Sequence, residues 1–222
     1  MGKIIVIAPH PDDETLGCGG SLLKHKEHHD EIYWLIVTSM KEEDGWETSE
    51  VEKRRDELNE VSNAYGFKKI FNLDFPTTKL DLIPINALVT SISKVVDDIK
   101  PNTIYIPNRS DIHSDHRKTF ESAMSACKSF RMDFIKKILM YECLSETEFA
   151  SSLQENAFSP NYFVDISKYL EEEINILKVF KSELREFPFP RSEINIRALA
   201  SYRGATANVK AAEAFVLIKE IA

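Results

Sequence analysis

The chain has 222 residues, of which 43% are hydrophobic and 10% aromatic, enough for one domain with a buried core and too apolar for disorder. Its net charge of −8 argues against a non-specific nucleic-acid binder, which needs a basic surface. The segment after Met1 has no apolar run long enough for a signal peptide or a membrane span. The three cysteines form no close pair, so we expect reduced thiols, a cytoplasmic location and a single domain over residues 1–222.

The first two-thirds of the chain alternates short β-branched segments with longer amphipathic ones. Their apolar spacing predicts strands and helices in turn. In chain order the predicted elements are a strand over Lys3–Ala8, a helix over Thr15–Lys26, a strand over Glu31–Thr38, a helix over Thr48–Tyr65, a strand over Lys69–Asn72, a helix over Ile85–Ile99, a strand over Thr103–Pro107, a helix over Arg117–Lys128 and a strand over Lys137–Cys143. Apolar strands separated by helices indicate a mainly parallel sheet covered on both faces, a three-layer α/β sandwich.

The C-terminal third is less regular. Tyr162–Asp165 is predicted to form a short strand, and Ser167–Lys181 a helix with Ser167 as its N-cap. The Phe187–Pro190 stretch interrupts the pattern before a last, basic segment. No internal repeat or long linker divides the chain.

Polar residues follow the first predicted strand, at the end where parallel α/β sheets gather functional groups. The imidazole of His10 and the carboxylate of Asp13 are ligands that suit zinc. Pro9 and Pro11 fix φ on either side of His10 and stiffen the turn. Asp12 lies beside this pair without being needed as a ligand, which suits a general base. The alternative, an acidic start to the next helix, explains Asp13 but not His10.

A second polar cluster, with His113, Asp115 and His116, follows the fourth predicted strand. Either histidine would join His10 and Asp13 to complete the three protein ligands of a catalytic zinc, which keeps one position open for water. The other histidine is then free for acid or electrostatic work. Asp115 could hold a ring N–H and fix a tautomer, so we count it with the catalytic residues.

The two motifs, His10–Glu14 and His113–His116, resemble those of the PIG-L / LmbE-like family of zinc-dependent N-deacetylases. The likeness extends to the stretches Thr15–Leu22, Arg54–Gly66 and Arg203–Phe215, and therefore touches nearly the whole chain. The resemblance implies a Rossmann-like fold and removal of an acetyl group from an N-acetylglucosamine-type sugar or sugar conjugate. Bacillithiol-pathway and sugar-nucleotide deacetylases belong to the same group.

The resemblance also assigns roles to individual residues. It implies that His10, Asp13 and His116 bind zinc and that Asp12 is the general base. His113 would stabilise the oxyanion or act as an acid. Fe²⁺ or another divalent ion could replace zinc, because N and O ligands discriminate weakly between such ions. The implied partner is a small N-acetyl sugar, without nucleic acid or membrane, and a homo-oligomer is compatible with the sequence.

Substrate contacts outside the motifs are predicted from residue type alone. Trp46 falls in a polar stretch and could stack on a sugar ring. Arginine recognises oxygen-rich groups with two parallel hydrogen bonds. The candidates are Arg54, Arg55, Arg109 and Arg203, with Arg191 and Arg197 as further members of the set.

Two other functions stay open at this point. A hydrolase of a different bond, such as a phosphoesterase, is one, although two-metal sites usually need more carboxylate ligands than the motifs supply. The other is a catalytically silent sugar-binding module of the same fold. A silent module would be expected to lack a ligand or the base, whereas all five implied residues are present.

Overall fold

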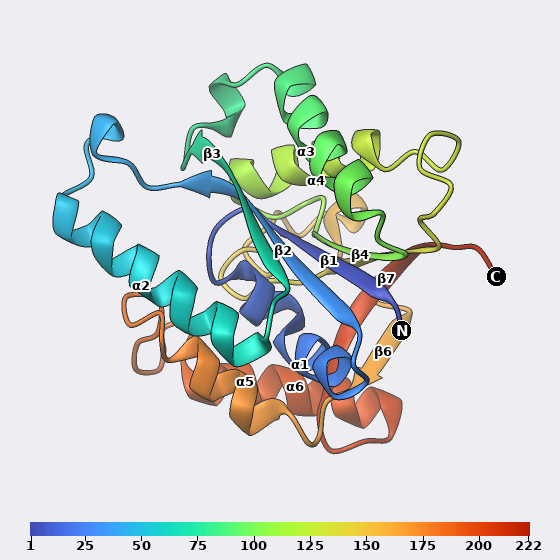
Figure 1. Ribbon diagram of the computed structural model, residues 1–222. Coiled ribbons are helices and arrows are strands. Elements are labelled where there is room, and N and C mark those ends of the chain that lie inside the picture. Colours follow the sequence, from blue (N-terminus) through green and yellow to red (C-terminus); the bar gives the residue numbers. More distant parts are fainter.

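Figure 1 shows the computed structural model, which describes residues 1–222. Seven strands form one sheet in the order β3-β2-β1-β4-β5-β7-β6. Neighbours from β3 to β5 pair in parallel, and β7 is antiparallel to both β5 and β6. The strands are β1 (Lys3–Ala8), β2 (Glu31–Ser39), β3 (Lys69–Pro76), β4 (Thr103–Pro107), β5 (Lys137–Tyr141), β6 (Tyr162–Asp165) and β7 (Ala212–Glu220).

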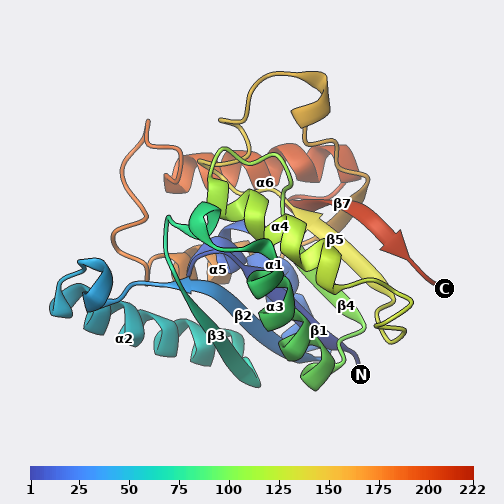
Figure 2. The same ribbon diagram turned by 90° about the horizontal axis from the view of Figure 1, so that it is seen from above.

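Helices cover both faces of the sheet (Figures 1 and 2). Two of them, α3 and α4, lie on one face, and the other four lie on the opposite face. The helices are α1 (Asp13–Glu27), α2 (Thr48–Tyr65), α3 (Ile85–Ile99), α4 (Ser114–Ala126), α5 (Leu170–Leu177) and α6 (Glu193–Ala207). None of them is long and apolar enough to cross a membrane.

The residues of the central strand β1 show why helices cover both faces of the sheet. Ile4, Val6 and Ala8 belong to the core under α1 and α2, whereas Ile5 and Ile7 belong to the core under α3 and α4. All five side chains are buried, because successive residues of a strand point to opposite faces. This arrangement confirms the expected three-layer α/β sandwich with a mainly parallel sheet.

The C-terminal third departs from the sequence-based expectation. Helix α5 covers only Leu170–Leu177, and Ser167 is not its N-cap, because the Ser167 hydroxyl donates to Asp165 Oδ1 at 2.5 Å. Helix α6 and strand β7 were not predicted. The buried residues of α6 are only Ile196, Ala200 and Gly204, so its apolar stripe is too narrow to be recognised by period.

Helix α1 is kinked and packs very close to the sheet. Cys18 has non-helical dihedral angles of φ −155° and ψ 25° inside the helix. A Cβ atom on Gly17 would come within 2.2 Å of the Tyr141 ring, and one on Gly20 within 2.6 Å of Ile166. Glycines at these positions let α1 approach β5, with the loop before the helix lying at the carboxyl end of the sheet.

Candidate active site

The loop between β1 and α1 is held in a strained conformation. Asp12 has φ 116°, a left-handed value that side-chain-bearing residues rarely adopt. The buried carboxyl group of Glu14 accepts the Asp12 N–H at 2.9 Å and the Thr15 hydroxyl at 2.7 Å. On the other side, the backbone N–H and the hydroxyl of Thr38 in β2 both donate to the Pro9 carbonyl. These bonds fix the positions of the loop's polar side chains.

The parallel strands β1 and β4 are neighbours, so their carboxyl ends bring the two sequence motifs together. One ligand atom each from His10, Asp13 and His116 lies within 4.8 Å of the other two. Oδ2 of Asp13 is 3.4 Å from His10 Nδ1 and 3.3 Å from His116 Nε2. This trio has the donor set of a catalytic zinc site, two imidazoles and one carboxylate.

Each of the two imidazoles is hydrogen-bonded through the nitrogen that points away from Asp13, so its other nitrogen is free to bind a metal ion. His116 Nδ1 donates to Asp111 Oδ2 at 2.8 Å, and His10 Nε2 donates to Asp115 Oδ2 at 3.0 Å. When both rings are neutral, as metal ligands must be, the lone pairs of His116 Nε2 and His10 Nδ1 face Asp13. His116 Nε2 is buried and has no hydrogen-bond partner of its own. A buried polar atom without a partner is costly, so this nitrogen fits a site that holds a metal ion.

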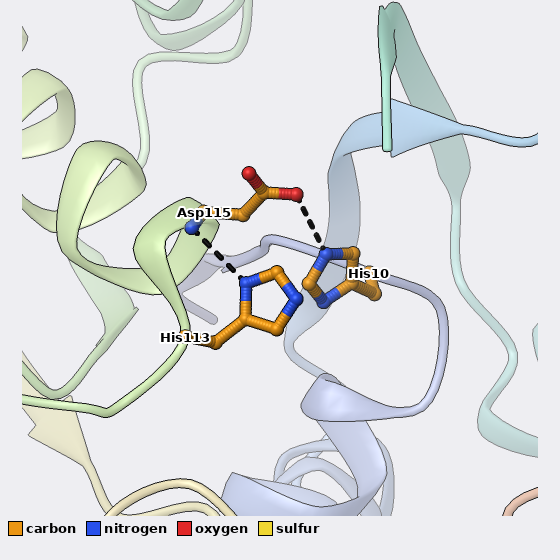
Figure 3. A group of neighbouring side chains, drawn as sticks. All are labelled: His10, His113 and Asp115. Carbon is orange, nitrogen blue, oxygen red and sulfur yellow. Dashed lines mark hydrogen bonds and ion pairs between the residues drawn. The ribbon is translucent and has the colours of Figure 1, made fainter. Parts of the chain in front are cut away.

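A second set of possible ligands, His10, His113 and Asp115, fits an ion less well (Figure 3). His113 is the N-cap of α4, and its Nδ1 accepts the Asp115 N–H, so in the neutral ring the proton is on Nε2. Both carboxylate oxygens of Asp115 already accept, from His10 and from the backbone N–H groups of Thr78 and Leu80. His113 therefore presents a donor to the pocket and Asp115 is a buried acceptor.

The titration properties of these groups differ with their surroundings. Burial alone would lower the pKa of His10, but its hydrogen bonds to Asp115 and Asp13 outweigh burial and raise that pKa to about 9. The pKa of His113 is lowered to about 4, first by burial and then by the two neighbouring imidazoles. His113 is neutral at pH 7, which differs from the protonated acid that one of its implied roles requires.

Asp12 lies in a different environment from its neighbour Asp13. Burial raises the pKa of Asp12 to about 7, against the opposing effect of the Arg191 guanidinium. Arg191 Nη1 donates to Asp12 Oδ2 at 2.6 Å, and the same guanidinium contacts Glu183 and Glu146. A carboxyl group that titrates near neutrality suits a general base.

A pocket of about 440 Å³ lies at the carboxyl ends of β1, β2 and β3, a volume typical of small-molecule sites. His10, Asp12 and His113 contribute to its lining, and α2 forms one wall. The pocket also includes four of the predicted substrate contacts, Trp46, Arg54, Arg55 and Arg191.

The remaining predicted contacts lie elsewhere. Arg109 donates to the Glu155 carbonyl, and Arg203 forms a two-bond pair with Glu142 at 2.8 and 2.6 Å. Neither lines the large pocket. Arg197 is paired with Glu171 and Glu193 at the surface.

Several residues of this site were missed in the sequence analysis, or were named there for another role. Asp111, behind His116, lies two residues before the second motif and could have been recognised as a partner for a ring nitrogen. Glu14 was named only as the last residue of the first motif and was given no role. Cys143 and Arg191 contact Asp13 and Asp12 across 130 and 179 residues of chain, respectively. No local pattern marks such distant contacts.

The fold and the His–Asp–His cluster, in which Asp13 and His116 are buried and His10 lines the pocket, define an enzyme site at the carboxyl edge of a parallel sheet. The model of the PIG-L family, described as GlcNAc-PI de-N-acetylase, matches residues 5–127, and this chain belongs to that family.

Known proteins agree with this assignment. Diacetylchitobiose deacetylase of Thermococcus kodakarensis is 27% identical over 219 residues, 95% of this chain and 81% of the relative. Among solved structures, conserved protein TT1542 from Thermus thermophilus has a TM-score of 0.78 at 24% identity. The match covers 100% of this chain and 97% of the TT1542 chain. N,N'-diacetylchitobiose deacetylase from Pyrococcus horikoshii has a TM-score of 0.77 at 23% identity, and the match covers 98% of this chain and 84% of the Pyrococcus chain. Together with the family match, these relatives make the chain a deacetylase enzyme.

Proposed function

We propose that this chain is a zinc-dependent hydrolase that removes the acetyl group from an N-acetylated amino sugar or sugar conjugate. The observation that carries the proposal is the buried Nε2 atom of His116. It has no hydrogen-bond partner, and it faces the Asp13 carboxylate while Asp111 holds the other ring nitrogen. His10, Asp13 and His116 would hold the ion. A zinc ion there would polarise the acetyl carbonyl and make water a better nucleophile near neutral pH.

The residues around the ion suit the remaining steps of amide hydrolysis. Asp12, ionised at the start, accepts a proton from the attacking water. The Nε2–H of neutral His113 donates to the carbonyl oxygen as negative charge develops on it. The neutral imidazole has no acidic proton to give, so Asp12 returns its proton to the amine as the C–N bond breaks. Acetate and the free amino sugar are the products.

The charges of the pocket favour an uncharged sugar as the substrate. Arg54 donates to Glu183 and to the Pro11 carbonyl, and Arg191 is shared among carboxylates, so neither guanidinium is free for a phosphate. Arg55 is exposed at the wall of the pocket. We propose that neutral N-acetylglucosamine-type sugars, such as N,N'-diacetylchitobiose, are deacetylated in preference to nucleotide-linked ones.

Acetate release measured against metal content tests this function. The purified protein should contain about one zinc per chain and release acetate from diacetylchitobiose faster than from a nucleotide-linked N-acetylglucosamine. His116→Ala should lose both the zinc and the activity. Zinc binding without acetate release from any N-acetyl sugar would instead support a silent binding module or hydrolysis of another bond.

Two further assignments belong to this proposal. We propose one domain over residues 1–222, because a single seven-stranded sheet includes strands from Lys3 to Glu220. We propose a cytoplasmic location because all three cysteines are free and buried.

A further inference from the structure

The turn that follows β5, residues Cys143–Thr147, lies against the back of the metal-site cluster. It is outside the segment that the family model matches. Its own backbone is constrained: Ser145 has φ 74°, and the N–H groups of Glu146 and Thr147 both donate to the Cys143 carbonyl. A strained turn that is tightly bonded to itself can hold its side chains at fixed positions.

Cys143 contacts Asp13 on the side away from the imidazoles. Its Sγ is 3.3 Å from Asp13 Oδ1, and both residues are fully buried. Oδ2 of Asp13 accepts the His10 backbone N–H and faces the two imidazole nitrogens. The thiol hydrogen is the only one available in the Cys143–Asp13 contact, so the thiol donates and the carboxylate accepts. This bond opposes rotation of the carboxylate away from the imidazoles.

Thr147 acts on the opposite ligand in a similar way. Its hydroxyl donates to Asp111 Oδ1 at 2.7 Å and accepts the Cys143 N–H at 2.9 Å. The other oxygen of Asp111 accepts from His116 Nδ1. The turn is therefore bonded to a carboxylate ligand directly and to an imidazole ligand through Asp111.

We propose that the turn Cys143–Thr147 positions the metal ligands, with the Cys143 thiol holding Asp13 and the Thr147 hydroxyl holding Asp111 behind His116. Both are positioning residues, since neither lines the pocket or belongs to the His10, Asp13 and His116 ligand set. The inference rests on the proposed function, because it requires that His10, Asp13 and His116 bind a metal. Removing partners of this kind typically weakens metal binding by about 10–100-fold.

Zinc affinity of the metal-free protein, measured by competition with a chromophoric chelator, tests the proposal. Cys143→Val and Thr147→Val remove a donor at nearly constant size, and each should weaken zinc binding by about 10–100-fold. Cys143→Ser and Thr147→Ser keep a hydroxyl donor and should restore affinity close to that of the wild type. Cys127→Val makes the same exchange in the core under α3 and α4 and should leave zinc affinity unchanged.

The possible outcomes separate the two proposals. Wild-type affinity in both valine variants would overturn the positioning role, and so would equal losses in the valine and serine variants. A wild-type chain that binds no zinc contradicts the proposed function, and this inference falls with it. Thermal unfolding of each metal-free variant identifies losses that come from misfolding. If Cys143→Val does not fold, the half-buried Thr147 pair of variants decides the result.

Discussion

Adjacent carboxyl groups in this site have opposite electrostatic surroundings. Burial would raise the pKa of Asp13, but the nearby imidazoles of His116 and His10 outweigh it and hold that pKa well below its usual range. Burial dominates for Asp12, whose pKa is raised to about 7. One carboxylate is therefore fixed in the ionised state that a ligand needs. Its neighbour can exchange a proton near neutral pH.

Substitution should separate these two roles. Asp13→Ala removes a ligand and should abolish zinc binding, with activity lost as a consequence. Asp12→Asn keeps nearly the same size and should retain zinc while kcat falls by about 10²–10⁴-fold. Zinc content and steady-state kinetics of both variants are the measurements. The reverse pattern, zinc lost in Asp12→Asn and kept in Asp13→Ala, would mean that the roles are exchanged.

The pH dependence of activity should report the Asp12–Arg191 contact. A general base must be deprotonated, so activity falls as the pH drops through the pKa of Asp12. Arg191 lowers that pKa, and Arg191→Gln should therefore move the acidic limb of the kcat profile to higher pH. Arg191→Lys keeps the positive charge and should move it less. An unchanged acidic limb in Arg191→Gln would show that another group limits the rate at low pH.

The residues of the proposed metal site could be singled out from the sequence because each motif follows directly on a strand that is easy to recognise. Their partners could not. Asp12 meets Arg191 only because the segment after α5 returns to the first loop. Cys143 reaches Asp13 through the order of strands in the sheet, which the pattern of apolar residues does not determine. Long-range pairing follows from tertiary packing, and a single sequence carries little local trace of it.

At the scale of elements, the kink in α1 exposes backbone donors that a distant strand satisfies. After Cys18, the N–H groups of Gly20 and Ser21 donate to the Glu213 carboxylate of β7 at 2.7 and 2.8 Å. Glu173 of α5 is buried beside this carboxylate. Burial raises the pKa of both groups, that of Glu213 to about 7, and Glu213 raises the pKa of Glu173 further.

These two buried carboxyl groups should make stability depend on pH. A glutamate titrates near 4.5 when unfolded, so between that pH and about 7 the folded chain binds more protons than the unfolded one. Stability should therefore fall as the pH rises through this window. Glu173→Gln removes one charge and should flatten the decline. At pH 8 its Tm should exceed that of the wild type by about 2–4 °C for each kcal/mol gained.

Thermal unfolding from pH 4.5 to 8 in the presence of a chelator measures this effect without a bound metal ion, and comparison of the variant with the wild type cancels the titration of Asp12 and Glu14 in the same range. Glu172→Gln on the same helix is the control, because Glu172 is exposed and its Lys26 contact is a distant 4.0 Å. A Glu173→Gln profile parallel to that of the wild type would show that the pKa of Glu173 is the same in the folded and unfolded states. The sequence analysis missed this pair because it recognised neither the kink in α1 nor strand β7.

At the scale of the whole molecule, the proposed metal site joins loops that belong to distant parts of the chain. Its proposed ligands come from the ends of β1 and β4, and the turn after β5 is hydrogen-bonded to Asp13 and Asp111 beside them. An ion bound only by the folded state stabilises it by about 4 kcal/mol at 1,000 times its Kd. Such an ion links all these elements to one another.

Chelation should therefore lower the thermal stability of the protein. At the ratio of about 2–4 °C per kcal/mol, removing zinc from a site saturated 1,000-fold should reduce Tm by about 8–16 °C. Adding zinc back should restore it, and His116→Ala should show neither change. Equal Tm values with and without zinc in the wild type would argue that no ion binds at this site in the folded protein.

The position of β7 also has a consequence for synthesis on the ribosome. This strand is the last along the chain, yet it lies between β5 and β6, which are made earlier. Until β7 emerges, β6 has no partner in the sheet and β5 presents an open edge, the kind of surface on which nascent chains associate wrongly. Strands β1 to β5 can pair during translation, while Glu213 and its bonds to α1 arrive only with β7. The nascent chain should therefore stay sensitive to proteolysis and dependent on chaperones until β7 has left the exit tunnel.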